Sequence, residues 1–249
     1  MKKIGIVGGT AWLSTVDYYT AICRMSEQFH AAQNRKGPLP TPEMSIESLD
    51  LKKAVSYIGT QEDEGSWRLF DAYHRDALRR LEANGVDVAI MASNTPHHRF
   101  EAITRGIGIP VISIFEAVAK ECARIGIERL LIVGTALTMD ARTMCEVFAT
   151  YGVDAFTPRT DEEKASVIAV IADVQCGMLH GAAERINNIA KTSFGRESQG
   201  RPVVCLACTE LPCAFPAMKG CSTFEDDDIL YINTLAIHAK AAFDSAVAP

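Results

Sequence analysis

Residues Val86–Ala92 read VDVAIMA, and the polar turn Ser93–Thr95 follows them directly. A short apolar run of this kind is typical of a buried parallel strand, and in such sheets ligands bind beyond the carboxyl ends of the strands. The pattern recurs once: Arg201–Ala207 reads RPVVCLA, and the polar turn Cys208–Glu210 follows. The two stretches therefore predict two strands that each carry a binding turn at the carboxyl end.

The same alternation of elements continues outward from these two stretches. Apolar or alternating runs predict strands, amphipathic runs predict helices, and the loop at 34–42 is marked by three prolines and a glycine. Further strands are expected at 3–7, 44–49, 109–114, 129–133 and 153–156. Helices are expected after a Ser14–Thr15 cap, and at 66–84, 114–125, 139–151, 161–191 and 229–246.

This order of elements predicts an α/β protein with parallel sheets flanked by helices and right-handed crossovers. Because the order of elements restarts half-way along the chain, we expect two similar subdomains. The first is formed by residues 1–113 together with 225–249, and the second by residues 114–224. If the two polar turns face each other across a cleft between the subdomains, Ser93 and Cys208 lie on opposite sides of one ligand.

Composition excludes disorder, collagen-like repeats and coiled coil as the main state of the chain. The chain has 249 residues, 48% hydrophobic and 22% charged, as in ordinary globular proteins. Its net charge of −6 comes without a basic stripe, and the longest acidic run is Glu225–Asp228. Nucleic acid is therefore not expected as a partner.

The chain shows no targeting or membrane signal. No apolar run approaches the roughly 18 residues of a membrane span, and the basic start lacks the longer apolar region of a signal peptide. We expect no membrane partner and a cytoplasmic location, where the eight cysteines are mostly free thiols.

Two cofactor motifs are considered and set aside. The glycines at 5, 8 and 9 do not have the G-x-G-x-x-G spacing, and Trp12 fits poorly beside a pyrophosphate, so a tight strand-to-helix turn is preferred to a dinucleotide site. Cys205 and Cys208 have C-x-x-C spacing, but no second pair exists to complete a structural zinc site. Neither a metal nor another cofactor is expected.

Cys208 differs from the other cysteines because Thr209, Glu210 and a proline follow it. Backbone donors at the strand end are expected to lower the pKa of its thiol toward neutrality and make it a usable base or nucleophile. Cys205 and Cys213 are interpreted as packing residues. For His97 and His98 a capping or solvated role is preferred. Lys164, near a helix N-terminus, is interpreted equally as an anion-binding or a solvated lysine.

From end to end the sequence resembles the aspartate/glutamate racemase family. The resemblance rests on Ile4–Gly9 with Trp12 and Tyr18–Tyr19, on Ser93–His97 where the family has Cys-Asn-Thr-x-His, and on Val133–Met139. Leu206–Pro212 is similar to the family's second cysteine motif, the most specific signal, and 237–239 matches its last helix.

The resemblance implies two pseudo-twofold-related subdomains with the active site between them, commonly in a homodimer. It implies cofactor-independent racemisation of an acidic amino acid, in which one group removes the α-proton and another returns a proton from the opposite face. Cys208 would be one base and Ser93 would hold the second position. Lys164 would bind the side-chain carboxylate of the substrate. The other substrate contacts would come from Thr10, Asn94, Thr95, Thr135, Thr209 and Glu210.

The sequence departs from the family pattern at several positions. Ser93 stands where the family has its first cysteine, and a serine hydroxyl is a far weaker base than a thiolate. Thr10 stands where many members have Met. The family's basic residue after the second strand has no firm match, although Lys52 and Lys53 are near.

Three functions remain open at this point. The leading one is a racemase of aspartate or glutamate that favours the L-enantiomer. The second is a decarboxylase-type lyase, since arylmalonate decarboxylases look similar and keep only the second cysteine. The third is a dicarboxylate-binding relative without turnover.

Overall fold

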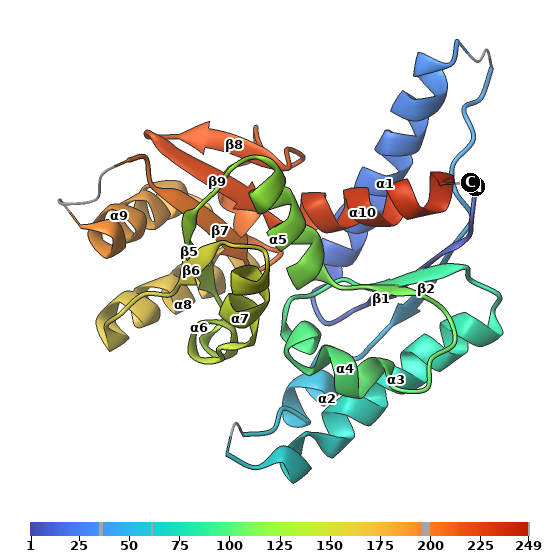
Figure 1. Cartoon of the computed structure of the whole chain (residues 1–249), viewed down its shortest axis with the longest axis horizontal. Coiled ribbons are helices and arrows are strands. Elements are labelled where there is room, and N and C mark those ends of the chain that lie inside the picture. The colour runs from blue at the N-terminus through green and yellow to red at the C-terminus, as the bar shows by residue number, and fades with distance from the viewer. Residues whose placement is uncertain (35–36, 61, 196–199, 249) are drawn as a thin grey trace. The chain divides into compact units, whose positions relative to one another are not determined.

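The computed structural model describes residues 1–34, 37–60, 62–195 and 200–248. These divide into two compact units, the first formed by Met1–Ile114 and His238–Pro249 and the second by Phe115–Ile237. Each unit contains one sheet (Figure 1). The α/β class with two parallel-dominated sheets flanked by helices is confirmed.

The sheet of the first unit has the order β2-β1-β3-β4 and is parallel throughout. α1 and α10 lie on one side of it and α3 and α4 on the other (Figure 1). Its elements are β1 (Ile4–Gly8), α1 (Trp12–Ala32), β2 (Met44–Ser48), α2 (Leu51–Ser56), η1 (Glu64–Trp67), α3 (Arg68–Ala83), β3 (Val88–Met91), η2 (Thr95–Arg99), α4 (Phe100–Thr104) and β4 (Val111–Ile112).

The sheet of the second unit has the order β6-β5-β7-β9-β8, and only β8 runs antiparallel among its described strands. α5 (Ile114–Arg124) leads into this unit and α10 (Thr234–Val247) leads out of it. The elements between are β5 (Arg129–Gly134), α6 (Ala136–Asp140), α7 (Thr143–Thr150), β6 (Asp154–Phe156), α8 (Asp161–Gln175), α9 (Ala182–Phe194), β7 (Val203–Ala207), η3 (Leu211–Ala214), β8 (Thr223–Asp226) and β9 (Ile229–Asn233).

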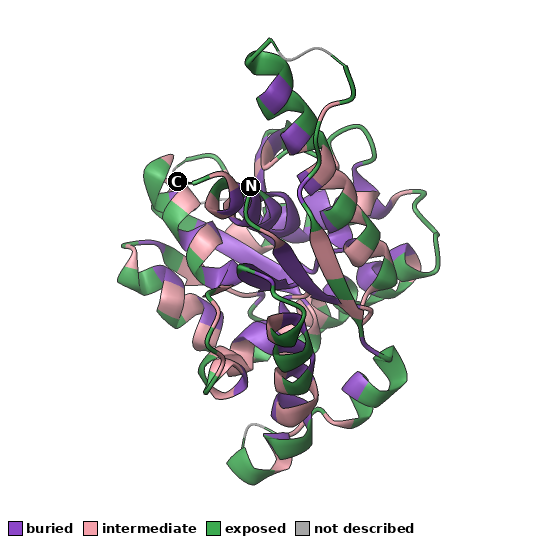
Figure 2. Ribbon diagram, turned by 90° about the vertical axis from the view of Figure 1, so that its right-hand side faces the viewer, coloured by how far each residue is buried: buried purple, intermediate pink, exposed green. Residues whose placement is uncertain are grey.

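Alternation of side chains along the strands places apolar residues on both faces of the second sheet. Leu131 and Val133 of β5 belong to a buried cluster with residues of α8 and α9, and Leu130 and Ile132, which alternate with them along the strand, are equally buried. Figure 2 shows the strands among the buried residues and the outer faces of the helices exposed. Both faces are covered, as a parallel sheet requires.

Several expected elements differ from those observed. The helix expected at 161–191 is two helices, because Gly177 and Gly181 between them adopt positive φ values of 76° and 69°. The helix expected at 139–151 is α6 and α7. Ser14 and Thr15 lie inside α1 and not at its cap; the Thr15 hydroxyl instead accepts the Gly9 N–H.

The largest difference concerns residues 223–246. The helix expected to start at residue 229 begins at Thr234, and Ile229–Asn233 is the strand β9, paired with β7 and β8. Asp227 and Asp228, both with positive φ, form the turn between β8 and β9. Residues 225–237 belong to the second unit, whereas the sequence pattern predicts them in the first.

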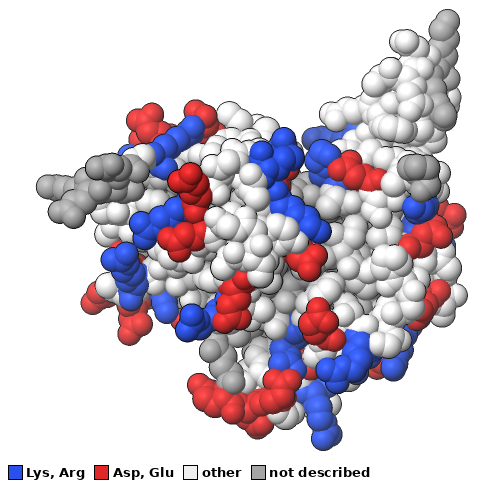
Figure 3. All heavy atoms as spheres, in the orientation of Figure 1, with Lys and Arg blue, Asp and Glu red and all other residues white. Residues whose placement is uncertain are grey.

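Charged side chains of both signs alternate over the face seen in Figure 3. None of the helices among the described residues combines the length and apolar content needed to cross a bilayer.

Candidate active site

In the first unit, the predicted site residues lie at the carboxyl edge of the sheet. Thr10 follows β1, and Ser93 and Asn94 follow the neighbouring strand β3. Thr95 opens η2. Asn94 is buried, whereas Ser93, Thr95 and Thr10 are partly exposed.

The turn after β1 depends on Gly8 and Gly9. A Cβ on Gly9 would lie 2.2 Å from the carbonyl oxygen of Leu49, and its φ of 87° disfavours other residues. A Cβ on Gly8 would meet the side chain of Thr15 at 2.5 Å. The glycines thus let the turn pass close to the end of β2 and the first turn of α1, which places Thr10 at the sheet edge.

His97 is a buried structural residue and not a group exposed to substrate. Its Nδ1 accepts the backbone N–H of Ile114 and its Nε2 donates to the carbonyl of Met91, at 3.3 Å each. Burial lowers the pKa of His97 well below its usual range. The ring is therefore neutral and ties the end of β3 to the start of α5.

His238 completes this buried network beneath the turn at 93–95. Its Nε2 donates to the carbonyl of Ile112 at 2.9 Å, so its Nδ1 accepts the hydroxyl proton of Tyr18 at 2.8 Å. Burial lowers the pKa of His238 to about 4. The two rings meet edge to face, with centroids 5.4 Å apart. His97, the histidine of the Ser93–His97 motif, thus stabilises the polar turn from its buried side.

In the second unit, Cys208, Thr209 and Glu210 follow β7 and are all nearly buried. Thr135 follows β5, the strand next to β7, so it lies at the same sheet edge. Its hydroxyl accepts the backbone N–H of Thr138 as the cap of α6.

Gly134 sets the spacing between β5 and the strand that carries Cys208. A Cβ at this position would lie 2.9 Å from the carbonyl oxygen of Ala207 and 3.0 Å from the side chain of Thr138. No carbon packs that close to a backbone oxygen without a shift of the chain. Glycine at the end of β5 therefore allows the residue before Cys208 to approach.

The environment of Cys208 holds its thiol protonated. Burial raises the pKa of Cys208 to about 12, and the charge of Glu210 acts in the same direction. The backbone N–H groups of Glu210 and Leu211 lower the pKa, as expected from the strand end, but they do not outweigh burial. The expectation of a thiol pKa near neutrality is therefore wrong for this structure.

Glu210 and Gln175 form a polar contact beside the thiol. Glu210 Oε2 accepts the side-chain amide of Gln175 at 2.6 Å and lies 3.9 Å from Cys208 Sγ. Gln175 is the last residue of α8, so this helix ends at the turn that carries Cys208. Sequence reasoning did not identify Gln175, because the helix was expected to continue through it.

Lys164 lies in the first turns of α8, as expected, and has an internal partner. Its Nζ donates to Asp140 Oδ1 at 2.6 Å, at the end of α6. The helix is capped by Thr160 and Glu163, whose side chains each bond the other's backbone N–H. The ion pair explains how a lysine is tolerated near this helix start.

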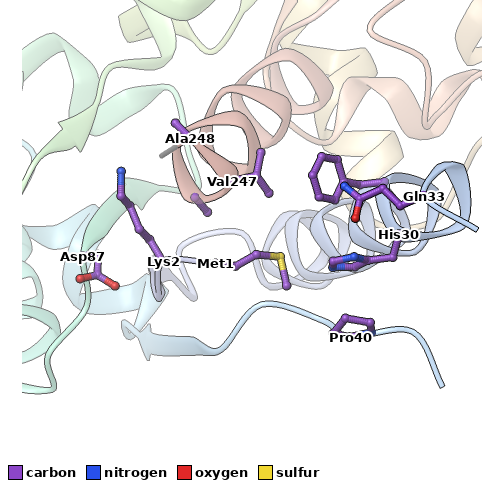
Figure 4. Close-up of a pocket in the computed structure, with 10 residues that line it drawn as sticks. Met1, Lys2, His30, Gln33, Pro40, Asp87, Val247 and Ala248 are labelled. Carbon is purple, nitrogen blue, oxygen red and sulfur yellow. The ribbon is translucent and has the colours of Figure 1, made fainter. Parts of the chain in front are cut away.

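One pocket, of about 680 Å³, lies away from all these residues (Figure 4). Lys2 and Asp87, which precede β1 and β3, line it together with residues from the end of α10. It is therefore at the amino edge of the first sheet, opposite the edge that carries Thr10 and Ser93. The described residues include no group of three or more His, Cys, Asp or Glu side chains arranged to hold a metal ion.

The model of the Asp/Glu/hydantoin racemase family matches residues 7–242. The chain belongs to the Asp/Glu/hydantoin racemase family. That match extends over both units and includes the polar turns after β3 and β7. The match confirms the resemblance to the aspartate/glutamate racemase family that the motifs along the whole sequence indicate.

Solved structures of racemases share this fold. An aspartate racemase homologue from Pyrococcus horikoshii is 29% identical with a TM-score of 0.75, and each chain covers 100% of the other. An aspartate racemase from Picrophilus torridus is 19% identical with a TM-score of 0.73, over 99% of this chain and 94% of that one. A glutamate racemase from Campylobacter jejuni is 15% identical with a TM-score of 0.62, over 98% and 85%.

Proposed function

We propose that the chain is a cofactor-independent racemase of acidic amino acids, aspartate or glutamate, that favours the L-enantiomer. The observation that carries this proposal is the buried thiol of Cys208 at the carboxyl end of β7, beside a carboxylate, in a chain of the racemase family. A thiol is suited to the work because it can both remove and return a proton at carbon.

In this proposal Cys208 acts on one face of Cα. In its thiolate form Cys208 takes the α-proton, so the S–H bond forms as the Cα–H bond breaks, and the electron pair left on Cα is delocalised into the α-carboxylate. Asn94, Thr95 and Thr209 would bind the α-carboxylate and amino group, with Thr10 and Thr135 contributing hydroxyl groups. Preorganised donors of this kind stabilise the charge that develops as the proton leaves.

Ser93 would hold the second acid–base position, directly or through a water molecule that it binds. Its hydroxyl is a weaker base than a thiol, so the two directions of proton removal are expected to differ in rate. Lys164 would exchange its contact with Asp140 for the distal carboxylate of the substrate, which gives the site its preference for dicarboxylic amino acids.

The test is deuterium incorporation at Cα of L-aspartate and L-glutamate in heavy water, with no pyridoxal phosphate added. We expect exchange with at least one substrate and slower racemisation. Cys208→Ser should reduce exchange about 10²-fold or more, the usual cost of losing an acid–base group. Binding without any exchange would contradict the proposal and favour a non-catalytic relative.

We further propose that the protein works as a homodimer in the cytoplasm. Trp12, Val16 and Tyr19 share one face of α1 by their spacing and are 67%, 52% and 48% exposed, a stripe that suits a second copy. The eight cysteines are free, as in a reducing compartment. Sedimentation at micromolar concentration tests the dimer, and alkylation of thiols in fresh lysate tests the free cysteines.

A further inference from the structure

We propose that the pocket at the amino edge of the first sheet binds a free aromatic amino acid whose ring carries a polar group, such as tryptophan. The described residues that line it all belong to the first unit. Its volume of about 680 Å³ is within the range of small-molecule sites, about 300–1,000 Å³. Because the pocket lies at the edge opposite Thr10 and Ser93, the inference does not rest on the proposed racemase activity.

One end of the pocket carries side chains of opposite charge. Lys2 and Asp87 lie at this end (Figure 4), where they precede the neighbouring strands β1 and β3. The Asp87 carboxylate accepts the backbone N–H of Lys3 at 2.6 Å, which fixes its position and leaves acceptor sites for an ammonium group. The backbone N–H of Lys2 donates to the carbonyl of Ala246 at 2.8 Å. An α-amino acid matches both charges, because its carboxylate can pair with Lys2 and its ammonium group with Asp87.

The middle of the pocket is suited to a flat ring. The Met1 side chain lies between the charged end and the end formed by His30 and Gln33 (Figure 4). Phe29, which is 37% exposed, and Pro40 also line the pocket. Thioether sulfur and aromatic rings both make favourable contacts with a further aromatic ring. An aromatic side chain on the amino acid is therefore expected to bind more tightly than an aliphatic one.

The far end of the pocket offers a polar partner to the ring. Gln33 follows the last turn of α1 and is exposed, whereas His30 in that turn is buried. The side-chain amide of Gln33 can accept the N–H of an indole or bind the hydroxyl of a phenol. Phenylalanine has no such group on its ring. We therefore expect tryptophan and tyrosine to bind more tightly than phenylalanine.

The test compares L-tryptophan with two analogues that each lack one of its charges. Tryptamine has no carboxylate, and indole-3-propionate has no ammonium group. Saturation-transfer NMR titrations give the three dissociation constants, and the chain carries no tag because Met1 and Ala248 line the pocket. L-Tryptophan should bind about threefold to tenfold more tightly than either analogue, the factor expected for one charge pair at a partly exposed site.

Two variants remove the protein's side of each charge pair. Lys2→Gln should weaken the binding of L-tryptophan about threefold to tenfold and leave tryptamine unchanged, because tryptamine has no carboxylate to lose a partner. Asp87→Asn should weaken L-tryptophan by a similar factor and leave indole-3-propionate unchanged, while its amide oxygen can still accept the Lys3 N–H. Lys240→Gln is the matched control, since Lys240 is an exposed lysine of α10 that pairs with Asp244 outside the pocket lining. It should change none of the dissociation constants.

Three results would overturn the inference. The first is a lack of saturation transfer to L-tryptophan from the unmodified chain. The second is equal affinity for L-tryptophan and both analogues, which would exclude an amino acid as the class of ligand. The third is binding of L-tryptophan that neither Lys2→Gln nor Asp87→Asn weakens, which would place the ligand outside this pocket. None of these measurements uses turnover, so a failure of the racemase proposal would leave this inference standing.

Discussion

At the scale of single residues, Ser93 carries the sharpest test of a site with two acid–base positions. Ser93→Cys should raise α-deuterium exchange and racemisation from D-aspartate at least tenfold, because a thiol matches proton transfer near neutral pH better than a hydroxyl does. Exchange from the L-enantiomer should change little. The measurement is parallel exchange from pure D- and pure L-aspartate.

Ser93→Ala serves as the comparison, since it removes the hydroxyl without adding a thiol. The equilibrium constant of a racemisation is one for any catalyst, so the variants can differ only in rate. If Ser93→Cys leaves D-side exchange unaltered, Ser93 does not face the substrate.

Lys164 gives a second test at this scale. Lys164→Ala should raise KM for aspartate at least tenfold, with little change in KM for alanine, because a charge-assisted contact to a carboxylate contributes about 1.5–3 kcal/mol. Lys191→Ala is the control, since Lys191 also pairs with an aspartate, Asp227, at the same distance of 2.6 Å. Equal effects on alanine and aspartate would place Lys164 away from the side chain.

The sequence predicts where the polar turns lie in the fold, but it does not predict the protonation chemistry of the side chains in them. The turns at 93–95 and 208–210 follow their strands as expected, because an apolar run that stops at small polar residues has few alternatives. The pKa of Cys208 was not predictable. It depends on burial and on the approach of Glu210, and neither can be read from spacing along the chain.

At the scale of elements, the predicted type and bounds of helices and strands are wrong mainly in long apolar stretches. Ile229–Ala239 reads ILYINTLAIHA, which suits a strand or a helix, and pairing with β7 and β8 decides that its first part is a strand. In 161–191 the two glycines that end α8 and precede α9 stand among good helix formers. Local propensity is a weak prior, and tertiary pairing overrides it.

Gly134 provides a test of how β5 positions β7. Gly134→Ala should destabilise the fold by about 1–3 kcal/mol, the usual cost of overpacking, because its Cβ would lie 2.9 Å from the carbonyl oxygen of Ala207. The strand end that carries Cys208 must then shift, so exchange should fall as well. Urea unfolding and α-deuterium exchange are the measurements.

Gly220→Ala is the matched control in the same unit, because no atom lies within 4 Å of a Cβ at that position. It should leave both exchange and the urea midpoint nearly unchanged. A stable and fully active Gly134→Ala variant would show that β5 and β7 can separate without harm to the site.

At the scale of the whole molecule, the two units are expected to differ in their sensitivity to acid. The histidines with lowered pKa values among the described residues, His74, His97, His98 and His238, all lie in the first unit. Burial is the first cause for each, so folding holds these rings neutral. A group whose pKa is lower in the folded state contributes stability above its unfolded pKa and loses it as the pH falls.

The first unit is therefore expected to unfold at a higher pH than the second. For His238 the pKa falls from 6.5 to about 4, which at 1.36 kcal/mol per unit makes about 3 kcal/mol of stability vanish between those pH values. Both tryptophans, Trp12 and Trp67, lie in the first unit, so their fluorescence reports on it. The buried thiol of Cys205 reports on the second unit through its reaction with dithiodipyridine.

Tryptophan fluorescence should change at a higher pH than the reactivity of Cys205 as the protein is acidified from pH 7 to pH 3. His98→Gln removes one titrating ring and should move the fluorescence transition to lower pH without moving the thiol transition, because Cys205 lies in the other unit. Coincident transitions in the unmodified chain would mean that the two units unfold as one cooperative body. In that case the histidine network beneath the turn at 93–95 would set the acid stability of both.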